Sequence, residues 1–496
     1  MRILIQLFAK LFAPATNRFY RALQNPELAQ KNLQKELFQR FTKSEYGKSL
    51  NITSLNNWRQ IPIVEYQDIQ TKLNQLTHEP IIFYEKTSGS RSAAKLIPYT
   101  QSLRRSFNHM FCVWAHDLIV NGSKFSTGKI YFCISPQLTQ PTDVTTLEDD
   151  SQYLDGWLRL ALSPFLVSPS GIQHIHNAEE FKHKLSQALL LAEDLEIISI
   201  WSPSFLKVML DYIQSHHKQL ASELKAKISA ERYNLLLETP EYSKLWRQLK
   251  LISCWDSANA ADGAEMLRKL FPDVLVQGKG LLATEAPMTI PLIAANGCVP
   301  MLDEVFFEFE DKKGNIYLLH ELQKGEVYEI IISQKGGLYR YRIKDRVRVT
   351  HFYQATPCLE FIGRTKEVSD LVGEKLHSEF VRQVLNNLPL TETSFKSFIP
   401  THFPTARYIL LLDMANTDIN ELAQKLDILL QQSHQYRHAR LLGQLAPPQI
   451  IVNPRVAEIL SLHKTRSGKK WGDLKHDILG TAPISKELLS ELNNFF

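Results

Sequence analysis

A chain of 496 residues with 44% hydrophobic and 22% charged side chains has the composition of folded globular proteins, which excludes a disordered chain, a collagen-like rod and a long coiled coil. The net charge is +5, from 57 basic and 52 acidic residues without a dense basic cluster, so no nucleic-acid partner is expected. The five cysteines are scattered and form no C-x-x-C pair, which disfavours a disulfide framework or a cysteine zinc site and predicts a reducing, cytoplasmic location.

The amino-terminal segment combines a short basic start with apolar side chains at helical spacing. These apolar residues are Ile3, Leu4, Leu7, Phe8, Leu11 and Phe12. Because Lys10 interrupts the run, the spacing favours an amphipathic helix packed on the body of the protein over a signal peptide, with a helix on a membrane surface as the alternative. The chain contains no run of about 20 apolar residues, so neither a spanning helix nor a membrane partner is expected.

Residues 17–46 have a helical composition, and the sequence from about 129 to 280 then alternates between the two kinds of secondary structure. Strands are expected at 129–135, 196–202, 251–256 and 274–280, and helices at 181–195, 203–217 and 260–271. Alternating helices and strands indicate an α/β core with parallel strands.

From about residue 303 the sequence changes to short strands separated by glycine or charged turns. These strands are expected at 303–311, 314–322, 325–333, 338–353 and 358–364. The pattern predicts a β meander that closes into a barrel-like part. Beyond Arg364, helical patterns at 377–388 and 419–442 and a strand at 406–414 indicate a small α+β domain.

The first candidate site segment reads FYEKTSGSRSAAKLIPYT, at residues 83–100. Ser88, Gly89 and Ser90 offer hydroxyl and backbone N–H groups to phosphate oxygens, and Lys95 supplies a positive charge. The segment lacks the spacing of a P-loop, so an ordinary turn is the alternative.

The second candidate is VQGKGLLATEAPMTIP, at residues 276–291, where two glycines precede Thr284 and Glu285. A carboxylate among apolar residues is costly to bury unless it is paired or bound to a metal ion. Glu285 is therefore a candidate Mg²⁺ ligand, with a glutamate on a surface loop as the alternative.

The third candidate is Asp345, in the basic, strand-like segment LYRYRIKDRVRV at residues 338–349. If side chains alternate, Asp345 points away from the face shared by Arg340, Arg342, Lys344, Arg346 and Arg348. A carboxylate placed in this way can accept hydrogen bonds from both hydroxyls of a ribose. A salt-bridged aspartate on a basic, solvent-facing strand is the alternative.

The fourth candidate is HKTRSGKKWGDLK, at residues 463–475, a glycine turn that carries Lys469, Lys470 and Lys475. A lysine on a mobile loop can be brought over a substrate to stabilise developing negative charge. A solvated basic loop is the alternative.

Taken together and in this order, the motifs resemble those of a known family. TSGS-RSAAK, ATE, YRIKD, LEFIGRTKEV and KTRSGK have the order and approximate spacing of the signatures of the adenylate-forming superfamily. The details, above all LYRYR-x-x-D-x-x-R-V-T followed by FIGR, are most similar to the auxin-responsive (Gretchen Hagen) family of acyl acid amido synthetases. The resemblance covers nearly the whole chain.

This resemblance implies a large amino-terminal domain, residues 1–365, and a small mobile carboxyl-terminal domain, residues 366–496, with Lys366 at the hinge. It implies ATP-binding residues, which would be Ser88, Gly89, Ser90, Lys95, Thr284, Glu285, Asp345 and Arg364. Glu285 would also hold Mg²⁺, and Asp345 the ribose. Lys469 matches the catalytic lysine of the superfamily, and Lys475 is the alternative match.

The resemblance implies the adenylation of a carboxylic acid by ATP, followed by transfer of the acyl group to an amine. The partners implied are a small carboxylic acid and an amine, by preference an amino acid. One alternative is a relative that transfers the acyl group to coenzyme A. Another is a catalytically silent acid-binding protein, because Arg91, Ser92 and Ala94 replace the usual residues of the phosphate loop. Trp114, Trp157 and Trp201 would stack on an aromatic acid, although tryptophans are more commonly core residues.

Overall fold

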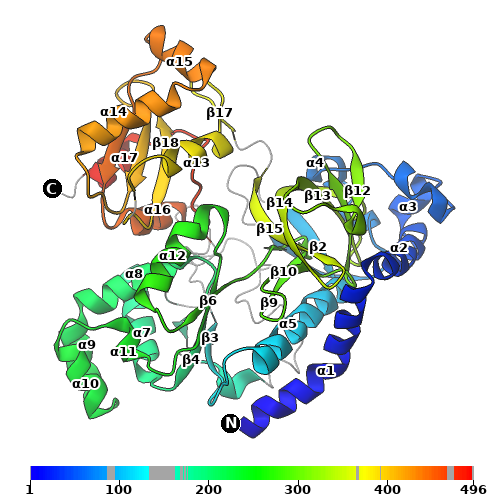
Figure 1. Ribbon diagram of the computed structural model, residues 1–496, viewed down its shortest axis with the longest axis horizontal. Helices are drawn as coiled ribbons and strands as arrows, with labels where there is room; N and C mark the ends of the chain where they lie inside the picture. Colours follow the sequence, from blue (N-terminus) through cyan, green and yellow to red (C-terminus); the bar gives the residue numbers. More distant parts are fainter. Residues whose placement is uncertain are drawn as a thin grey trace.

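The computed structural model describes residues 2–86, 95–132, 162–167, 171–172, 175, 177–364, 368–390, 392–465 and 474–493. These residues form three parts, which Figure 1 shows around a common centre. A parallel sheet with its helices and an antiparallel sheet come from the first 364 residues, and a smaller C-terminal part follows.

The parallel-sheet part confirms the predicted α/β core. Its four strands are paired in parallel in the order β3-β4-β5-β6, with bounds Lys129–Phe132, Leu195–Ser199, Leu251–Cys254 and Leu275–Gly278. Its helices are α7 (Ala178–Leu191), α8 (Pro203–Ser215), α9 (His217–Leu224), α10 (Ala230–Leu237), α11 (Tyr242–Leu245) and α12 (Ala261–Leu270). Helices cover the sheet, so nearly every strand residue is shielded from water. Strands that are buried in this way have mainly apolar sequences.

The antiparallel sheet has five strands in the order β12-β11-β13-β14-β15. Their bounds are Ile316–Leu318, Val305–Glu310, Val327–Gln334, Tyr341–Tyr353 and Thr356–Arg364. All five lie where the sequence predicts them. The expected barrel closure is wrong, because β12 and β15 are the outer strands of an open sheet among the residues that the structure describes. With three residues, β12 is too short to pair along the nine residues of β15.

Side chains alternate along β14 as predicted, since residues 341, 343, 345, 347 and 349 are buried and those between them are more exposed. Arg340 departs from the expected basic face. It precedes the strand, has a left-handed φ of 48° and is buried, and its guanidinium binds both carboxylate oxygens of Glu308 at 2.8 and 2.9 Å. A buried guanidinium requires such a partner, so Arg340 fixes the start of β14 and is not a solvent-facing residue.

Helices from the first 121 residues and short hairpins from residues 81–100 and 282–300 pack around the antiparallel sheet. The helices are α1 (Arg2–Gln24), α2 (Pro26–Lys43), α3 (Glu45–Ser49), α4 (Tyr66–Ile69) and α5 (Gln101–Asn121). The hairpin strands are β1 (Ile81–Lys86), β2 (Leu96–Thr100), β7 (Leu282–Ala283), β8 (Ala286–Pro287), β9 (Thr289–Leu292) and β10 (Gly297–Pro300). Short 3-10 turns occur at Leu55–Gln60, Leu73–Gln75, Ser163–Phe165, Ala258–Ala260 and Leu319–Glu321.

Helix α1 confirms the predicted amphipathic helix only in part. Ile5 and Phe12 are buried against the body, and α1 runs along α5 (Figure 1). Four other apolar side chains are between 43% and 74% exposed, namely Ile3, Leu4, Leu7 and Leu11. Among the described residues, no helix combines the length and apolar character needed to cross a bilayer.

The C-terminal part is the small α+β unit that the sequence predicts. Its strands are β16 (Val368–Ser369), β17 (Leu376–His377), β18 (Lys396–Thr401), β19 (Arg407–Leu412) and β20 (Gln449–Val452). Its helices are α13 (Ser378–Asn386), α14 (Ile419–Leu430), α15 (His434–Leu441), α16 (Val456–Thr465) and α17 (Lys486–Asn493). The single helix expected at 419–442 is two helices, because Ser433 caps α15 by accepting a hydrogen bond from the Tyr436 backbone N–H.

A buried ion pair joins the parallel-sheet part to the C-terminal part. Lys182 of α7 donates to Glu458 of α16 at 2.7 Å, and both residues are buried. Glu458 also accepts from Arg455 at 2.9 Å. Burial by itself raises the pKa of Glu458, but the hydrogen bonds from Arg455 and Lys182 outweigh it and the net pKa is lowered.

We expect Glu458→Gln to lower the free energy of unfolding by about 1–3 kcal/mol, because it weakens the hydrogen bonds of a buried lysine. The matched control is Glu360→Gln, whose pair with Arg348 is half-exposed at 3.6 Å and is worth about 0.5 kcal/mol. Since the pKa of Glu458 is lowered in the fold, its stabilisation is present above the ordinary glutamate pKa of about 4.3 and is lost as the pH falls below it. Melting temperatures at neutral pH measure the effect, and equal shifts for the two variants would contradict it.

Candidate active site

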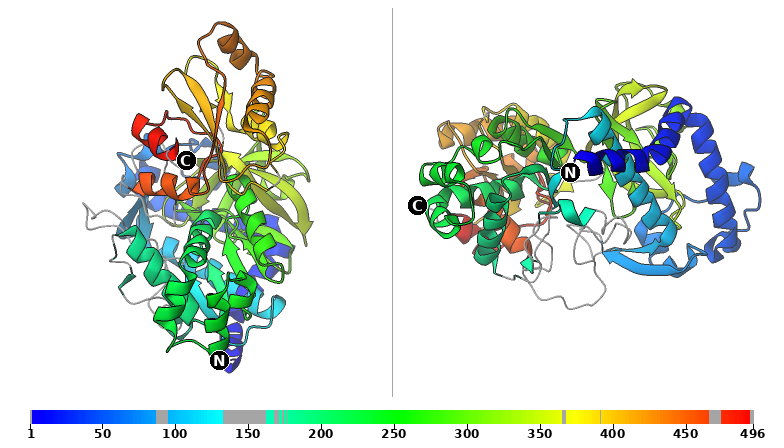
Figure 2. Two further views of the ribbon diagram at one scale, coloured as in Figure 1. Left: turned by 90° about the vertical axis from the view of Figure 1, so that its left-hand side faces the viewer. Right: turned by 90° about the horizontal axis from the view of Figure 1, so that it is seen from below.

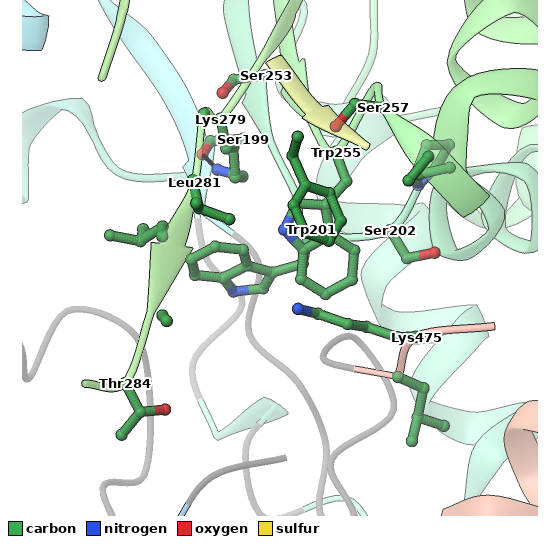
Figure 3. A pocket seen from close by; sticks show the side chains of 18 of the residues that line it. Ser199, Trp201, Ser202, Ser253, Trp255, Ser257, Lys279, Leu281, Thr284 and Lys475 are labelled. Atoms are coloured by element: carbon green, nitrogen blue, oxygen red, sulfur yellow. Dashed lines mark hydrogen bonds between the residues drawn. The ribbon is translucent and has the colours of Figure 1, made fainter. Parts of the chain in front are cut away.

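A cavity of about 440 Å³ lies where the three parts meet. Residues of the parallel sheet, the antiparallel sheet and the C-terminal part all line it, and Figure 3 shows the side of the cavity at the ends of the parallel strands. The cavity gathers every ATP-site residue predicted from the sequence that the structure describes: Lys95, Thr284, Glu285, Asp345 and Arg364.

Asp345 and Arg364 form an ion pair at one wall. They are opposite each other in the pairing of β14 with β15, and Arg364 Nε donates to Asp345 Oδ1 at 2.7 Å. The Asp345 side chain is buried, whereas Arg364 is 43% exposed. Lys344, next to Asp345, has a left-handed φ of 70°, and the register with β15 shifts just after Arg346. Such bulges redirect side chains at functional sites, and this one lies beside the predicted ribose ligand.

Glu285 occupies a rigid turn between β7 and β8. Tyr99 donates to the Thr284 carbonyl at 2.8 Å, and Gln334 donates to the Glu285 carbonyl at 3.2 Å. The Glu285 carboxylate is buried, with Lys95 Nζ at 3.9 Å from Oε1. Burial raises the pKa of Glu285, and the charge of Lys95 acts in the opposite direction. The surface-loop alternative for Glu285 is therefore wrong.

Glycine is required just before this turn. Gly280 has a left-handed φ of 69°, and a Cβ there would lie 2.7 Å from the Thr289 carbonyl oxygen. The next residue, Leu281, donates its N–H to Thr289 Oγ1 at 2.6 Å. The close approach of these two segments sets the direction in which the chain leads to Thr284 and Glu285.

Lys475 extends from the C-terminal part into the cavity. Figure 3 shows its amine directed at two indole rings, and Nζ is 4.8 Å from the centroid of the Trp255 ring. The side chain stays accessible to solvent within the cavity, yet it is surrounded by protein atoms. Desolvation by these protein atoms, followed by the charge of Arg364, lowers the pKa of Lys475, while Asp345 and Glu285 raise it to a smaller extent.

The other end of the cavity is aromatic and has one further cation. The rings of Trp201 and Trp255 lie 5.7 Å apart between centroids, and Trp114 donates to Gln277 at 3.0 Å. Lys279 donates to Ser199 Oγ at 2.8 Å and lies 4.8 Å from the centroid of the Trp201 ring. In Figure 3, Lys279 and Thr284 lie at opposite ends of one wall, with Leu281 between them. This end of the cavity is suited to a flat, apolar ligand that carries a hydrogen-bond acceptor.

Several predicted residues lie outside the described residues. They are Ser88, Gly89 and Ser90 of the phosphate loop, Lys366 of the hinge, Lys469 and Trp157. Their roles stay predictions, as does the domain boundary at 365/366. Trp114 and Trp201 line the cavity and also pack against the hydrophobic core, so the structure is compatible with both interpretations and their stacking on an acid stays a prediction.

Sequence reasoning missed Trp255 and Lys279, although a signal for both was present. Ser199 ends β4, Trp255 follows β5 and Lys279 follows β6. Open parallel sheets bind ligands at the carboxyl ends of their strands. Polar or aromatic residues in the carboxyl-terminal halves of the predicted strands at 196–202, 251–256 and 274–280 could therefore have been assigned to the site.

The charges of the cavity suit a nucleotide. Among the charged residues that line the cavity, the cations Lys95, Arg364 and Lys475 lie within electrostatic range of the carboxylates Glu285 and Asp345. Cations preorganised in a partly water-excluded cavity stabilise phosphate charge more strongly than they would in water. A carboxylate beside them accepts hydrogen bonds from sugar hydroxyls.

Glu285 also fits a Mg²⁺ ion. Lys95 Nζ, at 3.9 Å, is too far for a hydrogen bond to the Glu285 carboxylate oxygen. Burial raises the pKa of Glu285, so a cation bound beside it would stabilise its charged form. Mg²⁺ bound together with a nucleotide takes one or two carboxylates, and phosphate oxygens and waters complete its shell. The residues present are therefore compatible with this ion.

Family models match most of the chain. A model of the GH3 family N-terminal domain matches residues 15–276, one of the GH3 family central domain matches residues 298–364, and one of the GH3 family C-terminal domain matches residues 376–483. Among curated proteins, no sequence matches this chain significantly.

Solved structures show the same fold. The AtGH3.15 acyl acid amido synthetase in complex with 2,4-DB has a TM-score of 0.82 at 18% identity, covering 97% of this chain and 95% of that chain. A 2-hydroxyisobutyryl-CoA ligase in the postadenylation state, in complex with 2-HIB-AMP, has a TM-score of 0.53 at 12% identity, covering 94% of this chain and 90% of that chain. At these identities the likeness establishes the fold.

Proposed function

Because the chain belongs to the GH3 family, as its motifs predicted, we propose that it is an AMP-forming ligase that adenylates a carboxylic acid with ATP and transfers the acyl group to an amine, by preference an amino acid. The observation that carries the proposal is the convergence of Lys475, Arg364, Asp345 and Glu285 on one cavity that continues into an aromatic pocket. The arrangement supports both binding of a nucleotide and binding of an apolar acid.

In the first half-reaction, a carboxylate oxygen of the acid attacks the α-phosphorus of ATP, and pyrophosphate leaves with the bonding electrons. Negative charge builds on the phosphate oxygens during this displacement. Lys475 and Arg364 would neutralise that charge, and Asp345 would hold the ribose hydroxyls so that the α-phosphate faces the acid. When bound at Glu285, Mg²⁺ would shield the phosphate charges.

The acid would lie in the aromatic end of the cavity. Its apolar body would contact Trp114, Trp201 and Trp255, and Lys279 would hold a polar group at the far end. Its carboxylate would then be directed at Lys475, whose amine faces the same indole rings.

In the second half-reaction, the amine nitrogen attacks the acyl carbon, AMP leaves, and the nitrogen loses a proton. Lys475 comes from the C-terminal part, so rotation of that part about the predicted hinge at Lys366 would withdraw it and admit the amine. The chemistry needs no protein nucleophile, because the adenylate is itself a reactive acyl group.

The test incubates the purified chain with Mg-ATP, pooled carboxylic acids and pooled amino acids, and follows nucleotides and product masses together. We expect AMP, together with the mass of an acid–amino acid amide. AMP that appears only when coenzyme A is added would establish thioester formation instead. ATP that stays intact while calorimetry detects acid binding would establish the catalytically silent alternative.

A further inference from the structure

The first turns of α1 present an exposed aliphatic stripe, which we define as Ile3, Leu4, Leu7 and Leu11. These side chains are 74%, 43%, 54% and 59% exposed. Residues 3, 7 and 11 are each one helical turn apart, so the stripe is continuous along the helix. Single exposed leucines are ordinary on protein surfaces, but a contiguous patch of them marks an interaction site.

The stripe is not the side of α1 that packs on the protein. Ile5, Phe12, Phe19 and Leu23 are spaced by seven, seven and four residues and are all buried. They occupy a different side of the helix, which lies along α5. In Figures 1 and 2 the amino-terminal end of α1 lies at the periphery of the molecule. The fold therefore holds the stripe outward.

The charged residues that α1 itself carries are all positive. Lys10, Arg18 and Arg21 are exposed, and α1 contains no aspartate or glutamate along its 23 residues. Exposed aliphatic side chains flanked by lysine and arginine are the pattern of helices that lie in the plane of a membrane surface. Each basic residue near such a surface is attracted by anionic headgroups.

We propose that α1 binds an anionic membrane surface, with the aliphatic stripe inserted among the lipids and Lys10, Arg18 and Arg21 on the headgroups. A second copy of the chain suits this face poorly. A two-fold contact through it would place the same basic residues of both copies against one another, with no acidic partner on the helix. The sequence-based expectation of no membrane partner rested on this helix packing on the body of the protein and on the lack of a run of about 20 apolar residues.

Helix α1 lies close to the aromatic end of the cavity. Phe12 packs in one cluster with Phe111 of α5, and Phe111 lines the aromatic end of the cavity. A chain bound through α1 would thus hold the acid-binding end of its cavity one helix away from the lipid. The proposal itself is independent of the proposed enzymatic activity.

The test is flotation of the full-length protein with vesicles of phosphatidylcholine and phosphatidylglycerol. Leu7→Glu together with Leu11→Glu should lower the fraction that floats roughly tenfold or more, because two inserted aliphatic side chains become charged. The matched control is Leu28→Glu together with Ile428→Glu, which places the same charges at side chains of α2 and α14 that are 53% and 68% exposed, and it should float like the unchanged protein.

Two further measurements separate the membrane from other partners. Lys10→Gln together with Arg18→Gln should weaken binding, and raising the salt concentration should do the same, because the headgroup attraction is screened. Failure of the unchanged protein to float, or equal flotation of the stripe and control variants, overturns the proposal. A dimer in solution that the stripe variant converts to a monomer would assign the stripe to a second copy and also overturn it.

Discussion

Lys475→Ala is expected to lower acid-dependent exchange of pyrophosphate into ATP by about 100-fold or more, because it removes a preorganised cation from the reacting phosphate. The side chain enters the cavity from the C-terminal part, beside Trp255 and in the field of Arg364, Asp345 and Glu285. Transfer of the acyl group from a synthetic acyl adenylate to the amine should be affected much less, since that step begins after pyrophosphate has left.

Lys469→Ala is the matched control, because Lys469 is the other lysine that the family motif indicates. If Lys469→Ala abolishes exchange and Lys475→Ala does not, the two assignments are reversed. The pH dependence gives a second readout. Desolvation inside the cavity and the charge of Arg364 lower the pKa of Lys475, so the unchanged enzyme should lose exchange activity with rising pH earlier than a variant with Lys475→Arg, whose guanidinium stays charged.

Asp345→Ala is expected to raise the KM for ATP by about 10–100-fold, because hydrogen bonds to a charged group are worth roughly 1.5–3 kcal/mol each. The sharper readout is the choice between ATP and 2′-deoxy-ATP. The unchanged enzyme should prefer ATP, since a buried carboxylate would lose a hydroxyl partner with the deoxy nucleotide. Asp345→Ala should use both nucleotides equally poorly.

Arg364→Ala is the control for this experiment, because it removes the other half of the same ion pair. It should lower kcat while the preference for ATP over the deoxy nucleotide persists. An unchanged preference in Asp345→Ala would show that Asp345 does not hold the ribose and acts only through Arg364.

Site residues could be predicted where a short stretch of sequence is enough to indicate the role of a side chain. Asp345 could be separated from its basic neighbours because strand alternation is a local property, and β14 keeps that alternation from residue 341 to 349. Glu285 could be identified because a carboxylate in an apolar segment needs a partner. The tertiary structure then added the partner, Lys95, which lies 190 residues earlier in the chain.

The aromatic end of the cavity was less accessible to sequence reasoning. Trp255 and Lys279 come from separate strand ends, and neither carries a motif. They meet because β5 and β6 pair in parallel with their carboxyl ends aligned, Ser253 opposite Gln277. A tryptophan after a buried strand is equally compatible with the core, so its role depends on which helices leave space above it.

By itself, the sequence determined the α/β core, the five strands of the antiparallel sheet, the family and most of the nucleotide-site candidates, because periodicity and short motifs are local. Only the tertiary structure decided that the antiparallel sheet stays open, that Lys475 reaches the cavity from the C-terminal part, and that one side of α1 stays exposed. Each of these features depends on which distant part of the chain packs against a segment. Hydrophobic burial is non-directional, so an apolar pattern predicts that a face is buried but does not specify which surface buries it.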